Sequence, residues 1–199
     1  MINQDSSHHP HASSLLGHLE ALLNSVTSEL TAPHSIVEYC APLLSQMILD
    51  HPDDVKQLIK TLRWPSPQDE MYTRQRILEA DNGEWSVYAI CWLPGQYTPV
   101  HDHGTWGVVG VLQGRLHEHM MVLTHKDQAQ ERYYLEPAGV CLLAEGAVNT
   151  FVPEPDHIHK SGVPTSGQRT ASLHLYGRLM THYYSYDLES GIRSRLDVE

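Results

Sequence analysis

Most of the chain alternates short runs of strand-forming residues with clusters of turn-forming residues. The runs are rich in Val, Ile, Leu, Tyr and Trp, whereas Gly, Pro, Asn and Asp dominate the breaks. Many short strands at regular spacing are typical of an all-β sandwich or barrel. The cluster Pro137-Ala138-Gly139 is interpreted as one of the bends between strands. We expect strands at residues 85–93, 107–112, 116–123, 133–136, 140–144, 150–152, 172–176 and 183–187.

The first third of the chain has a helical pattern instead. Residues 1–12 are polar and predicted to be disordered, because they offer little apolar surface to offset the entropy of ordering. Apolar residues then recur at helical spacing, which predicts helices at residues 13–30, 35–50 and 52–62. We expect one domain, in which helices within 13–68 pack on a barrel formed by 69–199.

The composition argues against several classes of protein. A formal net charge of -11 opposes binding to a nucleic-acid backbone, and no apolar run is long enough to cross a bilayer. The N-terminal residues do not have the basic and apolar regions of a secretory signal, so we do not expect export. The three cysteines are an odd number beside apolar stretches, which fits a reducing compartment better than a disulfide scaffold. We therefore expect a cytoplasmic protein without nucleic-acid or membrane partners, and the sequence leaves its oligomeric state open.

Two pairs of histidines have the spacing His-x-His. In an extended segment the imidazoles of His101 and His103 point to the same face, where both can bind one metal ion. A pair of this kind in a chain with 15 histidines is more often two ordinary histidines. That reading is preferred for His117 and His119, which follow a turn and lack a preceding glycine motif.

The surroundings of the first pair resemble the first motif of the cupin superfamily. That motif has a glycine, five residues, His-x-His, three or four residues, a glutamate, six residues and a glycine. Gly95, His101, His103 and Gly114 fall at those places, but Gly107 stands where the glutamate is expected. Cupins that lack the acidic ligand and use three histidines include the thiol dioxygenases, among them cysteine dioxygenase and 3-mercaptopropionate dioxygenase.

From about Tyr72 onward the chain resembles bacterial thiol dioxygenases. The resemblance implies a mainly β cupin fold, which is a double-stranded β-helix or jelly-roll barrel, with a small N-terminal helical segment. It also implies an Fe(2+) cofactor and a third histidine ligand that follows an apolar residue. His159 matches this position and is preferred over His157, whereas Val163 stands where the second cupin motif has asparagine.

The family's second signature matches Ser172, His174 and Tyr176. On a strand these alternating residues face one side, where serine, imidazole and phenol can form a hydrogen-bonded chain that ends near the metal. The resemblance implies that Tyr176 donates a hydrogen bond to substrate or oxygen and that the other two residues orient it. Animal cysteine dioxygenases cross-link this tyrosine to a cysteine, but Gly107 and Val108 occupy that region here, so an unmodified phenol is expected.

Arg74 is the predicted contact for the substrate. Tyr72-Thr73-Arg74 matches the sequence with which cysteine dioxygenases place an arginine in the pocket, and Arg76 is a nearby competitor. A guanidinium can hold a carboxylate with two parallel hydrogen bonds. Relatives that act on 3-mercaptopropionate commonly carry glutamine here, but the stretch from His101 to Gly107 resembles them, so both substrates stay open.

These features predict an iron(II)-dependent enzyme that oxidises the sulfur of cysteine or 3-mercaptopropionate to the sulfinic acid with O2. Three neutral ligands leave the full charge on the ion, so a thiolate can bind deprotonated, and iron(II) can activate dioxygen whereas zinc cannot. Mercaptosuccinate or another thiol is an alternative substrate. A non-redox metal-binding cupin, either an isomerase or a binding module, is the alternative of another class.

Overall fold

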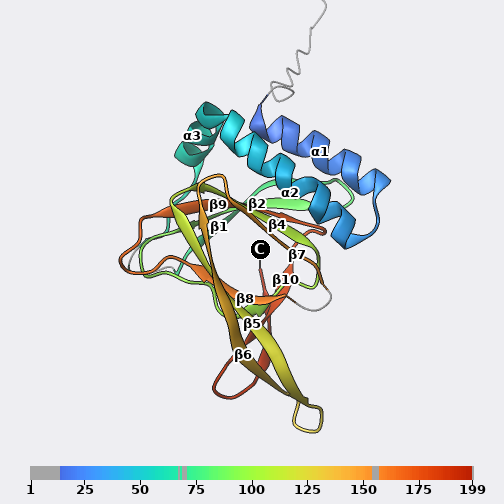
Figure 1. Cartoon of the computed structure of the whole chain (residues 1–199), viewed down its shortest axis with the longest axis vertical. Helices are drawn as coiled ribbons and strands as arrows, with labels where there is room; N and C mark the ends of the chain where they lie inside the picture. Colours follow the sequence, from blue (N-terminus) through green and yellow to red (C-terminus); the bar gives the residue numbers. More distant parts are fainter. Residues whose placement is uncertain (1–13, 67, 69–70, 154–156, 199) are drawn as a thin grey trace, which may run out of the picture.

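The computed structural model consists of two antiparallel β-sheets that face each other, with three helices covering the outer face of one sheet (Figure 1). It describes residues 14–66, 68, 71–153 and 157–198. The tail predicted to be disordered, residues 1–12, lies outside these residues. The two facing antiparallel sheets confirm the predicted double-stranded β-helix.

The three helices begin and end close to the predicted positions. They are α1 (Leu15–Glu29), α2 (Pro33–Asp50) and α3 (Pro52–Thr61). The Ser14 hydroxyl accepts a hydrogen bond from the Gly17 amide, and proline occupies the start of α2 and of α3, where the helix needs no amide donor. No helix of the described ranges is both long and apolar enough to cross a membrane.

Each sheet joins strands that lie far apart in the sequence. The five-stranded sheet has the order β1 (Thr73–Glu79), β2 (Ser86–Trp92), β9 (Thr170–Tyr176), β4 (Gly107–Gln113) and β7 (Val148–Phe151). The six-stranded sheet has the order β11 (Arg193–Asp197), β10 (His182–Tyr186), β3 (His101–Asp102), β8 (Ile158–Gly162), β5 (Arg115–Asp127) and β6 (Arg132–Ala144).

The predicted bend at Pro137-Ala138-Gly139 is wrong, because these residues lie inside the continuous strand β6. The strand is at the edge of its sheet, where a proline is tolerated because no partner requires its missing amide hydrogen. Met120 pairs with Gly139 and Met121 with Pro137, so Ala138 is an extra residue in a β-bulge. Residues 133–136 and 140–144 are therefore two parts of one strand.

Four strands, β1, β3, β8 and β11, are absent from the predicted set. Strands β1 and β11 are edge strands with half-exposed, polar sequences, so they lack the apolar alternation that marks a strand. Strand β3 has only two residues, and β8 is largely polar.

The five-stranded sheet is covered on both faces. On β9, Leu173 and Leu175 point outward into the apolar core shared with the helices, whereas Ser172, His174 and Tyr176 point inward to the space between the sheets. Helix α2 packs closely on β4, since a Cβ added at Gly110 would lie 2.8 Å from side-chain atoms of both Leu44 and Ile48. The predicted division into helical residues 13–68 and barrel residues 69–199 stays a prediction.

Candidate metal centre

His101, His103 and His159 converge in the space between the two sheets. One nitrogen of each ring can be chosen so that all three lie within 4.8 Å of one another, and all three residues are buried. His101 in β3 pairs directly with His159 in β8, and His103 follows β3. Of the two candidates for the third position, His159 therefore lies with the pair. His157 is outside this group and stacks on Phe151 at 5.1 Å between ring centroids.

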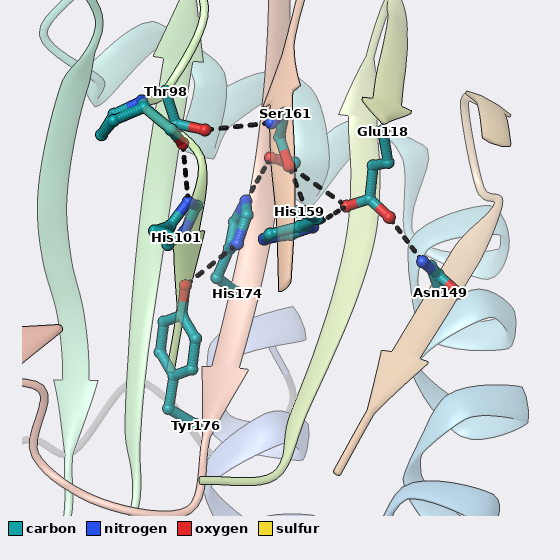
Figure 2. Close-up of polar contacts among 10 residues, drawn as sticks. Thr98, His101, Glu118, Asn149, His159, Ser161, His174 and Tyr176 are labelled. Carbon is teal, nitrogen blue, oxygen red and sulfur yellow. Dashed lines mark hydrogen bonds and ion pairs between the residues drawn. The ribbon is translucent and has the colours of Figure 1, made fainter. Parts of the chain in front are cut away.

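Hydrogen bonds orient two of the three rings (Figure 2). His101 Nδ1 lies 2.9 Å from the Pro99 carbonyl oxygen, which can only accept, so Nδ1 carries the proton and Nε2 keeps its lone pair. His159 Nδ1 lies 3.3 Å from the Ser161 hydroxyl. The Nδ1 atom of His103 is buried and makes no hydrogen bond within the described part of the chain.

Burial keeps these imidazoles neutral. It lowers the pKa of His101 to about 4 and lowers the pKa values of His103 and His159 well below the usual 6.5. Neutral imidazole is the form that binds a metal cation, and three such donors suit Fe, Zn, Cu or Ni. The centre thus fits a divalent transition metal and leaves other coordination positions for further ligands.

Phe151 fills the place where the cupin motif has its acidic ligand. Gly107 in β4 pairs with Phe151 in β7, and a Cβ added at Gly107 would overlap the Phe151 ring. That ring stacks on His103 with 4.2 Å between centroids and 18° between planes. The space that a glutamate at position 107 would need is therefore filled by an aromatic ring.

Ser172, His174 and Tyr176 form the predicted hydrogen-bonded chain. The Ser172 hydroxyl lies 2.8 Å from His174 Nε2, and the Tyr176 hydroxyl lies 3.3 Å from His174 Nδ1. Burial lowers the pKa of His174 to about 3 and raises the pKa of Tyr176, so both groups are neutral near pH 7. The ring of Tyr176 lies 5.4 Å from that of His103, which places these three hydrogen-bonded side chains beside the histidine cluster.

Arg74 and Arg76 lie in different environments. The Arg74 guanidinium stacks on Tyr88 at 3.6 Å, and its Nη2 donates to the Met180 carbonyl at 3.2 Å. Its Nη1 is buried and has no hydrogen-bond partner among the described residues. Arg76 instead forms an ion pair with Glu79 at 3.1 Å, and its side chain is 48% exposed. Of these two arginines, Arg74 is thus the half-buried one, and it has a buried donor atom that no described residue uses.

The second His-x-His pair lies away from the cluster. His117 and His119 are half-buried on one face of β5, and His119 packs on Tyr97. Glu118, between them, points the opposite way into the interior and is completely buried.

Glu118 and Asp102 are two buried carboxylates that the sequence analysis missed. The alternation of Leu116 and Glu118 on β5 could have indicated an inward direction for Glu118. Asp102 separates His101 from His103, and its Oδ2 accepts hydrogen bonds from the Tyr186 hydroxyl and from Arg193 Nη2, both at 2.7 Å. These contacts tie the short strand β3 to β10 and β11.

The fold and the histidine cluster define a cupin. Solved structures with a similar fold include the protein TT1209 from Thermus thermophilus, which is 16% identical over 61% of this chain and 93% of that protein, with a TM-score of 0.45. Another is a conserved protein with a double-stranded β-helix domain from Klebsiella pneumoniae, which is 15% identical over 71% of this chain and 88% of that protein, with a TM-score of 0.44.

The family follows from the sequence match. The model of the family "Cysteine dioxygenase type I" matches residues 60–188, which is more than half of the chain. The protein therefore belongs to the cysteine dioxygenase type I family. This membership supports a thiol dioxygenase and confirms the family resemblance found in the sequence.

Replacing Arg193 tests whether the ion pair with Asp102 stabilises the strand that carries His101. Asp102 is only 2% exposed, so Arg193→Met leaves a buried carboxylate without its cationic partner. We expect the free energy of unfolding, measured by urea denaturation of metal-free protein, to fall by about 3 to 5 kcal/mol. Arg195→Met is the matched control, since Arg195 pairs with Asp197 at the surface and should change stability by about 0 to 1 kcal/mol. Equal effects of the two variants would contradict this prediction.

Proposed function

We propose that the protein is an iron(II)-dependent thiol dioxygenase whose substrate is a small thiol carboxylate, either cysteine or 3-mercaptopropionate. The reaction adds both atoms of O2 to the sulfur, so that RSH and O2 give the sulfinic acid RSO2H. The observation that carries the proposal is a buried cluster of three neutral histidines, to which no acidic side chain of the described residues adds a ligand. Membership of the cysteine dioxygenase type I family supports the same reaction.

His101, His103 and His159 would hold the iron. When bound, iron(II) supplies a Lewis acid for the substrate thiolate and an electron donor for O2. Because the three imidazoles are neutral, they do not offset the charge of the cation, which favours binding of an anionic sulfur. The aromatic rings of Phe151 and Tyr176 lie beside His103 and would exclude water from one side of the centre.

Arg74 would bind the substrate carboxylate. Its unused Nη1 donor is buried, and its Nη2 atom is already fixed by the Met180 carbonyl. The stacking on Tyr88 holds the guanidinium plane in one orientation, which lowers the entropy lost on binding. A carboxylate would satisfy a donor that otherwise lacks a hydrogen bond.

Tyr176 would donate a hydrogen bond to the reacting groups. Neutral His174 can carry its proton on Nδ1 and donate it to the Tyr176 oxygen, while its Nε2 accepts from the Ser172 hydroxyl. The hydroxyl hydrogen of Tyr176 is then free to point away from Ser172 and His174. Ser172 and His174 would in this way hold the phenol as a donor.

The partners implied are the thiol and O2. The free thiols of Cys40, Cys91 and Cys141 support a reducing compartment such as the cytoplasm.

Oxygen consumption tests the proposed reaction. Protein loaded with iron(II) without air is mixed with cysteine, 3-mercaptopropionate, mercaptosuccinate or cysteamine, and O2 uptake and sulfinate are measured. We expect one sulfinate per O2 consumed with a thiol carboxylate. Iron-loaded protein that consumes no O2 with any of these thiols would favour the non-redox cupin instead.

Arg74→Ala tests recognition of the carboxylate. Loss of charge-assisted hydrogen bonds worth about 1.5 to 3 kcal/mol should raise the KM for the preferred thiol carboxylate by roughly 10- to 100-fold. Any activity with cysteamine, which lacks a carboxylate, should change less than about threefold. Arg76→Ala is the control and should leave both unchanged, because Arg76 lies at the surface. An equal loss on both substrates would remove Arg74 from this role.

Tyr176→Phe tests the phenol as a hydrogen-bond donor. Loss of one positioned donor should lower kcat/KM by roughly 100-fold, while the iron content stays that of the parent protein. Tyr134→Phe is the control, since Tyr134 is 47% exposed on β6. Loss of iron from the Tyr176 variant would mean that the tyrosine supports the centre structurally.

A further inference from the structure

Glu118 is a completely buried carboxylate in the interior of the barrel. Burying such a group is unfavourable unless it is paired and hydrogen-bonded, and burial accordingly raises the pKa of Glu118. No Lys or Arg forms an ion pair with it within the described residues. A neutral imidazole lies beside it instead, since Glu118 Oε1 is 3.7 Å from His159 Nδ1.

Ser161 bridges Glu118 and His159. A distance of 3.7 Å is too long for a direct hydrogen bond. The Ser161 hydroxyl lies 3.3 Å from His159 Nδ1 and 3.5 Å from Glu118 Oε1. It can accept a hydrogen bond from the imidazole N–H while it donates a hydrogen bond to the carboxylate. Backbone contacts hold Ser161 in place, since its amide donates to the Thr98 hydroxyl at 2.9 Å and its carbonyl accepts from the Thr98 amide at 2.8 Å.

Asn149 holds the other carboxylate oxygen. Its side-chain amide donates to Glu118 Oε2, as Figure 2 shows. Asn149 belongs to β7, Glu118 to β5 and Ser161 to β8, so the network joins both sheets immediately behind His159. A purely structural link between the sheets is therefore the competing explanation.

We propose that Glu118 is a positioning residue for the metal centre, which acts through Ser161 to keep the proton of His159 on Nδ1 and its Nε2 directed at the ion. The proposal rests on the proposed metal centre. A carboxylate behind a ligating imidazole also makes that imidazole a stronger donor. Glu118 thereby places a carboxyl group near the ion without binding it, whereas Phe151 fills the space that an acidic ligand at position 107 would need.

Binding of Co2+ to purified metal-free protein tests the proposal, because its visible absorption reports the ligands without any need for turnover. In competition with a chelator, Glu118→Gln should raise the Kd for Co2+ by about 10- to 100-fold. The same variant should keep or increase the free energy of unfolding of the metal-free protein, because a neutral amide is easier to bury than a carboxylate. Glu136→Gln, at an exposed position on β6, is the matched control and should change neither quantity.

Ser161→Ala provides a second variant, which removes the bridge and retains the carboxylate. It should also weaken Co2+ binding, by about 10-fold. If Co2+ binds both variants as tightly as the parent protein, the network is only structural and the inference is wrong. If the parent protein binds no Co2+, or if His101→Ala binds it equally well, the proposed centre itself fails and the inference fails with it.

Discussion

The pairing of β3 with β8 is the constraint on which the centre depends. It places His101 directly opposite His159, so two imidazoles from distant parts of the sequence meet in the interior. Strand β3 contains only two residues and has few ladder hydrogen bonds of its own. Its position is instead secured by β10 on the other side and by the buried contacts of Asp102 with Tyr186 and Arg193.

The interior between the sheets accepts so many polar groups because they satisfy one another. Ser172, His174 and Tyr176 form one hydrogen-bonded chain, and Glu118, Ser161 and His159 form another. A buried polar group without a hydrogen-bond partner would lower the free energy of unfolding. The unused donor of Arg74 is an exception, and it is the donor assigned to the substrate under the proposed function.

The charge of the centre is set by packing as well as by ligand type. Phe151 occupies the space beside Gly107 and stacks on His103, so the ring both excludes a carboxylate and fixes a histidine. The buried carboxylate of Glu118 lies behind His159. Neutral ligands would favour an anionic sulfur as an additional ligand under the proposed function, whereas the carboxyl group behind His159 would make this imidazole a stronger donor.

The sequence by itself determined the three helices, the β-sheet class, the His-x-His pair and the alternation of Ser172, His174 and Tyr176. These features depend on local periodicity, which specifies the face on which each side chain lies. Only the tertiary structure decided that His159 rather than His157 joins the pair, that Arg74 is half-buried with a buried Nη1 atom whereas Arg76 is exposed, and that β6 is continuous. It also revealed the polar edge strands and the position of Glu118. All these features depend on which strands become neighbours. Pairing between strands that are distant in the sequence leaves no periodic signal in either strand alone.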